Sequence, residues 1–208
     1  MTQQHHKNSH LLKMAWLVAV LFLVILFIAV VFVLFVTVRL QRSILTKSPV
    51  YTARELYNTA QQQITSGNYE QAEDYLKQAL LKEDDSTYRN QLAVVEYRLK
   101  KYSLSVAQYQ KLIDLHKDEG FAWNGIGNAY RDWATSDTLH RVEYKTTAEH
   151  AYRSAIAADP HYVAAYSNLA LMLYAAGNLT GAISVLNEGY TATGQSELQK
   201  LTKNMQIK

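Results

Sequence analysis

Hydrophobic residues are distributed very unevenly along the chain. Between Met14 and Val38, 25 consecutive residues carry no charge, and Thr37 is the one polar residue among them. A helix of that length measures about 37 Å, which is enough to cross a hydrocarbon core of roughly 30 Å with some tilt. The pattern therefore predicts a transmembrane helix over residues 14–38.

Two other interpretations of this apolar segment fit less well. A cleaved signal peptide has a shorter apolar region that ends in small residues, whereas this segment ends in Arg39-Leu40-Gln41-Arg42. A buried core helix is rarely apolar on all sides for seven turns. We therefore predict an uncleaved anchor. Its Ala15 and Ala19 form a small-x-x-x-small pair, a weak indication of self-association.

The anchor separates a short tail from a larger region. Residues 1–13 are polar, and residues 39–52 are expected to form a linker that contains Ser48-Pro49. From there 110 residues pass before Pro160, the only other proline. Apolar positions in this region follow the helical period throughout, without the alternation that is typical of strands. The sequence therefore predicts an all-α domain.

A short sequence pattern is repeated within this domain. Gly67-Asn68-Tyr69-Glu70-Gln71-Ala72 and Gly177-Asn178-Leu179-Thr180-Gly181-Ala182 place Gly-Asn, an apolar residue and an alanine at the same spacing. Gly and Asn both tolerate a positive φ, so the pair suits a tight connection between antiparallel helices. A small alanine three residues after the apolar residue allows the second helix to pack closely on the first. Internal repetition of this kind is typical of helical solenoids.

These positions resemble the tetratricopeptide repeat family. The first-helix signature of the family, Trp-x-x-Leu-Gly-x-x-Tyr, is nearly complete in Trp123, Ile126, Gly127 and Tyr130. The second-helix signature is matched by Ala148, Tyr152, Ala155 and Pro160, and again by Ala72, Leu76 and Ala79. The resemblance implies a right-handed α-solenoid of about four hairpins, over residues 53–85, 86–119, 120–162 and 163–194. Residues 195–208 should form a capping helix, centred on Ser196–Met205.

Two hairpins depart from the family pattern. In the second, Lys101-Tyr102 stands where the first and fourth have a turn with glycine. The third carries about nine extra residues, and Ser136 or Asp137 is suited to cap a helix there. We therefore expect one lengthened second helix over Leu139–Ala158. This helix could serve as a docking ridge, with Leu139, Val142 and Tyr144 as its apolar residues. The alternative is a lengthened helix that has no partner.

The resemblance also implies a binding surface. In this family the first helices of the hairpins line a concave groove that binds a peptide or helix of a partner protein. Amides on that surface can bond a peptide backbone, and Tyr, Phe and Leu offer apolar anchors. The alternative is that these are ordinary solvated helix faces. The family's groove positions correspond to Tyr57, Gln61, Asn90, Tyr97, Arg98, Asn124, Asn128, Arg131, Ser167 and Tyr174, with Arg54, Ile64, Thr87, Val94, Phe121, Asp132 and Leu171 beside them.

The residues argue against several other functions. The family's carboxylate clamp needs a lysine where Asn124 stands, and no basic pair follows in the next repeat. His5, His6 and His10 lie in the polar tail, where we expect no metal site, and the chain has no cysteine. No nucleophile elbow, His-Glu-x-x-His pattern or phosphate-binding glycine loop is present. We expect neither enzymatic activity nor a cofactor or a metal.

Charge is distributed as unevenly as hydrophobicity. All 18 acidic residues follow Tyr51 together with 16 of the 21 Lys and Arg, so that region carries a formal charge of −2. The net charge of +3 therefore comes from residues that flank the anchor, which argues against nucleic-acid binding and suits lipid headgroups. Lys7 and Lys13 before the span nearly balance Arg39, Arg42 and Lys47 after it. The positive-inside rule leaves the side of the domain open.

Two functions are compatible with these features. The first is a scaffold of the cell (inner) membrane, anchored in the bilayer through residues 14–38. It would bind a partner protein or peptide in its groove during assembly or maturation of a membrane or envelope complex. The second is an accessory subunit that a membrane complex holds mainly through the transmembrane helix.

Overall fold

The computed structural model describes Trp16 and residues 20–39 and 51–207. The chain divides into two compact units, one up to Val50 and the other from Tyr51 onward, and each is considered by itself. The predicted tail (1–13) and nearly all of the predicted linker (39–52) lie outside the described residues, as do Ala15 and Ala19.

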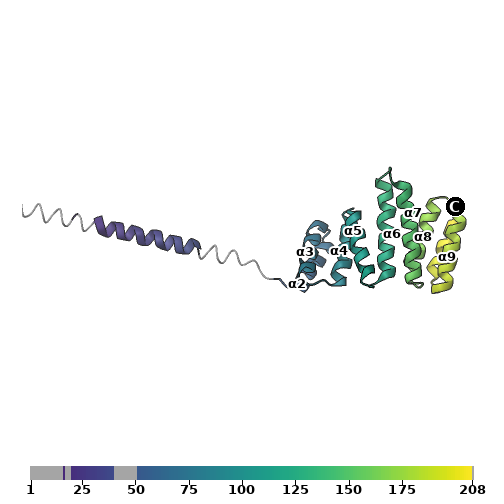
Figure 1. The fold of residues 1–208 in the computed structure, drawn as a ribbon, viewed down its shortest axis with the longest axis horizontal. Helices are drawn as coiled ribbons and strands as arrows, with labels where there is room; N and C mark the ends of the chain where they lie inside the picture. The colour runs from purple at the N-terminus through teal and green to yellow at the C-terminus, as the bar shows by residue number, and fades with distance from the viewer. Residues whose placement is uncertain (1–15, 17–19, 40–50, 208) are drawn as a thin grey trace, which may run out of the picture. The chain divides into compact units, whose positions relative to one another are not determined.

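The first unit contains the helix Val20–Arg39, drawn in purple in Figure 1. All of its described side chains are exposed within the chain. The hydroxyl of Thr37 donates a hydrogen bond of 2.9 Å to the carbonyl oxygen of Leu34, so the one polar side chain of the span is satisfied internally. By length and composition the helix can cross a membrane, a condition that a signal sequence also meets.

The second unit is a row of antiparallel helices without a strand between Tyr51 and Ile207 (Figure 1). Consecutive helices pack on each other along the whole row, as expected for an α-solenoid. The four hairpins and the last helix are α2 (Ala53–Thr65), α3 (Tyr69–Lys82), α4 (Ser86–Arg98), α5 (Tyr102–Asp114), α6 (Glu119–Ser136), α7 (Arg141–Ala158), α8 (Val163–Ala175), α9 (Leu179–Thr193) and α10 (Ser196–Gln206).

Turn chemistry explains where the hairpins bend. Gly67 and Gly177 adopt φ values of 79° and 81°, in the left-handed region that glycine enters without steric cost. Lys100 occupies the corresponding place in the second hairpin and has a φ of 59°. The turn that lacks glycine is therefore built with the same backbone geometry. A lysine in this region costs about 1 kcal/mol relative to its preferred conformations.

The core is formed where small residues let neighbouring helices approach. A β-carbon on Gly127 would lie 2.6 Å from the ring of Tyr152, so α6 and α7 meet as closely as the family signature requires. Tyr152, Tyr166, Leu169 and Leu186 are almost fully buried. Trp123 and Tyr130 are only partly buried and pack at the edge of the core.

A charged interface joins the first two hairpins. The carboxylate of Glu73, which is 3% exposed, accepts hydrogen bonds from the ammonium groups of Lys77 (2.7 Å) and Lys101. Burial alone would raise the pKa of Glu73, but these two bonds outweigh it and lower the pKa. Glu96 is 1% exposed, and its Oε2 has no hydrogen-bond partner among the described residues. Burial raises the pKa of Glu96 to about 7.

The third hairpin is lengthened in both helices, which corrects the prediction of a single long helix from Leu139. Both α6 and α7 have 18 residues, and α7 begins only at Arg141. The carboxylate of Asp137 accepts hydrogen bonds from the backbone N–H groups of Leu139 (3.0 Å) and His140 (3.2 Å). Asp137 thus shapes the connection, as a capping residue does, and the extra residues are divided between the two helices.

The predicted ridge residues at the tip of this hairpin differ in their exposure. Leu139 and Val142 are 85% and 80% exposed. The ring of Tyr144 instead packs on Trp133, with ring centroids 4.6 Å apart, and on Tyr130 at 5.6 Å. Tyr144 therefore holds the two helices together, because aromatic pairs at this distance are attractive. The exposed ridge consists of Leu139 and Val142.

The last helix closes the apolar core. Leu198 and Met205 of α10 are 0% and 5% exposed, and Leu201 packs beside them. A β-carbon on Gly189 of α9 would lie 2.9 Å from the side chain of Leu198, so α10 lies close against α9. This is the capping role that the sequence indicated for the end of the solenoid.

Candidate partner-binding groove

The first helices of the hairpins lie side by side. Helix α4 contacts α6, and α6 contacts α8, in addition to the contacts within each hairpin. The predicted groove residues lie on α2, α4, α6 and α8. Most are exposed or partly exposed, and Asn124 is buried. The surface therefore extends over all four hairpins.

Two of the predicted amides hold helices together. Asn124 is 5% exposed, and its Oδ1 accepts a hydrogen bond of 2.9 Å from Nδ2 of Asn168 on α8. The hydroxyl of Tyr152 on α7 donates a bond of 2.8 Å to Oδ1 of Asn128. These amide oxygens satisfy polar groups inside the solenoid, so both side chains already have a role in holding the helices together.

A polar bridge joins α4 to α6 in the middle of the surface. Arg131 Nε donates a hydrogen bond of 2.8 Å to Oδ1 of Asp132, and the hydroxyl of Tyr97 donates to Oδ2. Burial and this hydrogen bond raise the pKa of Tyr97 to about 12. The hydroxyl therefore remains a donor at neutral pH, and the two oxygens of Asp132 are both engaged.

The N-terminal end of the surface is aromatic. Tyr57 on α2 and Tyr88 on α4 have ring centroids 4.9 Å apart. They line a shallow hollow of about 290 Å³ together with Arg54. Next to it, Nε2 of Gln61 and Oδ1 of Asn90 have no hydrogen-bond partner among the described residues. Both atoms are buried, so this unpaired donor and acceptor lie beneath the surface, on α2 and α4.

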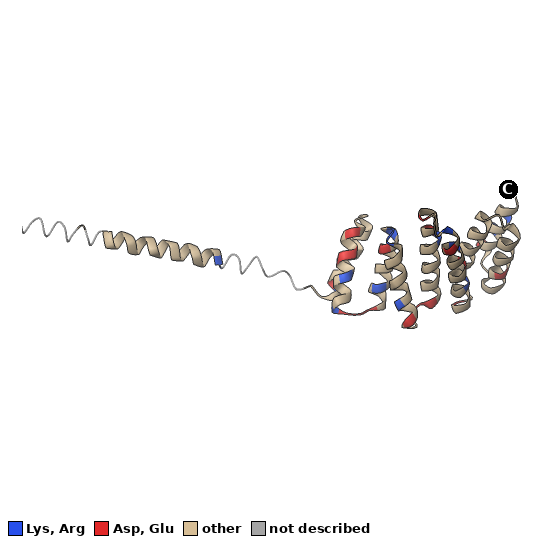
Figure 2. Ribbon diagram, turned by 45° about the horizontal axis from the view of Figure 1, so that its top comes forward, with Lys and Arg blue, Asp and Glu red and all other residues tan. Residues whose placement is uncertain are grey.

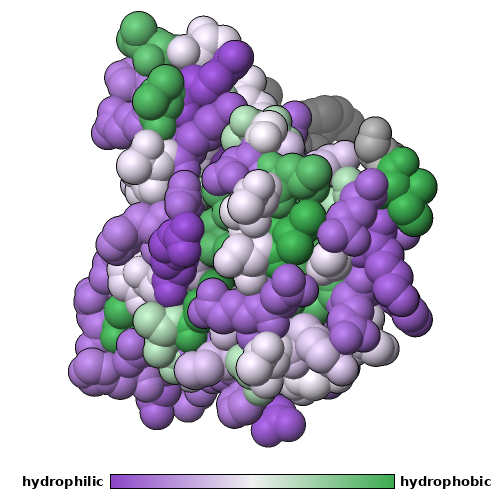
Figure 3. Space-filling model, turned by 90° about the vertical axis from the view of Figure 1, so that its right-hand side faces the viewer, coloured by the Kyte–Doolittle hydropathy of each residue, from purple (hydrophilic) through white to green (hydrophobic). Residues whose placement is uncertain are grey.

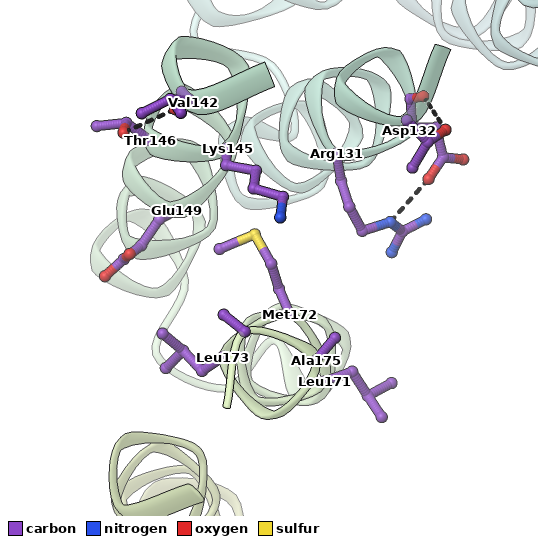
Figure 4. A pocket seen from close by; sticks show the side chains of 12 residues that line it. Arg131, Asp132, Val142, Lys145, Thr146, Glu149, Leu171, Met172, Leu173 and Ala175 are labelled. Carbon is purple, nitrogen blue, oxygen red and sulfur yellow. Dashed lines mark hydrogen bonds and ion pairs between the residues drawn. The ribbon is translucent and has the colours of Figure 1, made fainter. Parts of the chain in front are cut away.

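A larger pocket of about 610 Å³ lies where the lengthened hairpin meets α8. Residues of α6, α7 and α8 line it, among them Arg131, Lys145, Leu171 and Met172 (Figure 4). Arg131 and Leu171 were predicted from the family positions. Lys145 was not, because α7 is a second helix and the inserted residues have no counterpart in the family. Met172 on α8 was not among the predicted positions either. The insertion itself was the available signal.

Ser167 and Tyr174 are partly buried on α8, and Arg98 is exposed near the end of α4. Among the described residues no group of three or more His, Asp or Glu side chains could hold a metal ion. The surface offers hydrogen bonds, aromatic faces and an apolar pocket, which are the means of polypeptide recognition.

Solved structures of low sequence identity share this fold. The thermophilic TPR protein TTC0263 from Thermus thermophilus aligns with a TM-score of 0.60 at 15% identity, over 75% of this chain and 82% of its own. MamA from Desulfovibrio magneticus RS-1 gives 0.56 at 18%, over 74% and 84%. YrrB, described as a TPR protein with an unusual peptide-binding site, gives 0.53 at 18%, over 73% and 74%.

No curated protein matches the sequence significantly. The tetratricopeptide repeat family matches residues 57–131 and 146–197, which is more than half of the chain and includes parts of all four hairpins. The unmatched residues between these two segments contain the end of α6 and the start of α7, where the third hairpin is lengthened. With its antiparallel hairpins, glycine turns and capping helix, this chain belongs to the tetratricopeptide repeat family.

Proposed function

We propose that this protein is a membrane-anchored scaffold. It binds a segment of a partner protein along the surface formed by α2, α4, α6 and α8, during assembly or maturation of a membrane or envelope complex. The observation that carries the proposal is the composition of that surface. It has an aromatic hollow beside Tyr57 and a pocket beside α8, and buried amide atoms of Gln61 and Asn90 beneath it lack hydrogen-bond partners among the described residues.

Backbone groups of an extended peptide would match the unpaired donor and acceptor. Gln61 can donate to a carbonyl oxygen of the peptide and Asn90 can accept from a peptide N–H, once their side chains turn outward. Tyr57 and the pocket beside α8 would take apolar side chains, which supply most of the binding energy in such complexes. The similar fold of YrrB, whose description names a peptide-binding site, is consistent with this.

The apolar helix supports the membrane part of the proposal. Anchoring through residues 14–38 would confine the groove to a thin layer at the bilayer and raise its effective concentration for partners there. The accessory-subunit alternative rests on the same helix, since all its described side chains are available for contacts in the bilayer.

Photocrosslinking in native membranes tests the groove. A photoreactive amino acid would replace Arg98 on α4 or Leu171 on α8 in the full chain, and Gln78 on α3 or Asn187 on α9 as matched exposed controls. We expect a discrete adduct with one partner protein from the groove positions, and none from the controls. Equal labelling from both sets, or none from the groove, would contradict the proposal.

Exchanging the anchor separates the two candidate functions. In this variant residues 14–38 are replaced by an apolar helix of unrelated sequence, and the crosslinking at Arg98 is repeated. A scaffold that binds through its groove keeps the adduct, because any span confines it to the membrane. Loss of the adduct would favour the accessory subunit held by its transmembrane helix.

A further inference from the structure

The pocket beside α8 exists because the third hairpin is longer than the fourth. Helix α6 has 18 residues and α8 has 13, so the tip of the α6–α7 hairpin stands above its neighbours (Figure 1). The end of α6 and the first half of α7 then face the end of α8, within residues 171–176, across the pocket. A hairpin of ordinary family length would not form these walls.

The pocket presents apolar side chains to the solvent. Leu171 is 46% exposed and Val142 is 80% exposed, and Met172 lies between them (Figure 4). Seen from the C-terminal end, apolar side chains gather in the middle of the molecule and again on the tip that projects above it (Figure 3). A volume of about 610 Å³ is within the usual range for ligand pockets, roughly 300–1,000 Å³.

The charge that is not neutralised in the pocket is positive. The ammonium group of Lys145 points toward Met172 and makes no ion pair among the described residues (Figure 4). Both carboxylates in the lining are already engaged: Asp132 by Arg131 and Tyr97, and Glu149 by Arg153 at 2.8 Å. Arg131 uses only Nε for Asp132, which leaves its terminal nitrogens without an ion-pair partner among the described residues.

We propose that this pocket binds a segment of a partner protein in which an apolar residue stands next to Asp or Glu, an inference that rests on the proposed function. The apolar side chain would lie on Leu171, Met172 and Val142, and the neighbouring carboxylate would meet Lys145. The chain's own undescribed segments fit poorly, because residues 1–50 contain no acidic residue and five basic ones. Charge complementarity thus favours a separate protein over the chain's own tail or linker.

Peptide selection on the full chain tests this inference. The protein would be placed in nanodiscs of phosphatidylcholine, which has no net charge, and panned against a random dodecapeptide library displayed on phage. We expect enriched peptides to carry Asp or Glu beside Leu, Ile, Met or Phe. The most enriched peptide would then be synthesised, together with a counterpart whose acidic residue is replaced by its amide, and bound in solution.

Three variants locate the binding. Lys145→Glu should weaken binding of the synthetic peptide at least tenfold, and Val142→Ser should weaken it by a few-fold. Both side chains are exposed and outside the core, so the fold should be unaffected. Lys111→Glu, an exposed position on α5 away from the pocket, should leave affinity unchanged. The amide counterpart should bind the wild type less tightly than the acidic peptide does, and raised salt should reduce the difference between the two peptides.

Other outcomes would overturn the inference in distinguishable ways. One such outcome is that the selected peptides lack acidic residues. Another is that their affinity is unchanged by Lys145→Glu but falls with Tyr57→Ala. Either result would support the scaffold function and show that the pocket is not its binding site. Failure to enrich any binding peptide would count against both. Sedimentation of the solubilised full chain that shows self-association, abolished by Lys145→Glu, would mean that a second copy fills the pocket.

Discussion

The first two hairpins add buried charged side chains to their apolar helix interfaces, whereas the rest of the repeat unit packs aromatic rings against glycine. Between α3, α4 and α5 lie the buried side chains of Glu73, Arg89 and Glu96, with lysines at the rim. From α6 onward, aromatic rings pack against glycine, and residues 163–194 contain a single charged residue, Glu188. Figure 2 shows the same contrast, with few charged positions on the last hairpin.

The contrast shows that one repeat pattern tolerates two kinds of interior. Apolar contacts depend on volume, since close-packed interiors leave no room for an added side chain. Buried carboxylates depend on protonation and on their partners, because desolvation of a charge is costly. The two regions should therefore respond to different perturbations, and each of the following substitutions tests one side of the comparison.

The largest effect is expected at Gly127. A leucine there would place its β-carbon 2.6 Å from the ring of Tyr152, which is fully buried and has no space to move. Gly127→Leu should lower the free energy of unfolding by about 3 kcal/mol, measured by urea denaturation. Ala157→Leu, at an exposed position of α7, is the control and should change it little. Equal stability of the two variants would contradict close packing here.

The charged interface should respond to pH through Glu96. Its pKa is raised by burial to about 7 in the folded state, so the folded protein favours the protonated carboxyl. Its contribution to stability is therefore complete below the unfolded pKa of about 4.5 and is lost as pH rises through 7. Glu96→Gln should be nearly neutral at pH 4.5 and stabilising by up to about 3 kcal/mol at pH 8.5.

Urea midpoints across this pH range would measure the Glu96 effect, with Glu83→Gln at an exposed position as the control. The opposite shift of Glu73 is present in both proteins. Because Glu73, Lys77 and Lys101 act on the charge of Glu96, the difference between Glu96→Gln and wild type measures Glu96 together with its coupling to them. A difference that does not grow with pH would show that the carboxyl is not held in its neutral form.

The bridge between the two regions should have an intermediate effect. Tyr97→Phe removes the hydroxyl that donates to Asp132, and with it the link from α4 to α6. A hydrogen bond to a charged group is worth about 1.5–3 kcal/mol, so we expect a loss near the lower value for this partly exposed pair. Denaturation of Tyr190→Phe, whose ring is exposed, provides the comparison. Identical losses would mean that the bridge contributes nothing specific.

The smallest effect is expected at the turn of the second hairpin. Lys100→Gly should stabilise the protein by about 0.5 kcal/mol, because relief of the left-handed backbone exceeds the entropy that glycine adds to the unfolded chain. Lys111→Gly, within α5, should destabilise it by about 1 kcal/mol. The opposite signs can be read from thermal unfolding, and equal signs would contradict the backbone explanation.

Much of the fold was predictable because the repeat leaves strong local signals. Gly67 and Gly177 mark two turns and small alanines mark close contacts, and the resemblance to the family signatures then gave the number of hairpins. For the groove, the sequence predicted which positions lie on it but not which of their side chains are already bonded to other helices. Asn124 and Asn128 have amides suited to a ligand, but the bonds that occupy them come from Asn168 and Tyr152 on other helices. Sequence spacing within a helix carries no information about such partners.

The sequence by itself determined the apolar span and the helical character of the domain, since hydrophobic period and turn residues are local properties. Its resemblance to the family signatures gave the four hairpins and the presence of an insertion. Only the tertiary structure decided how the insertion is used. It divided the extra residues between α6 and α7, enclosed Tyr144 between them and brought Lys145 over Met172. Those outcomes depend on packing between helices of unequal length, and packing between distant segments is what a one-dimensional pattern cannot specify.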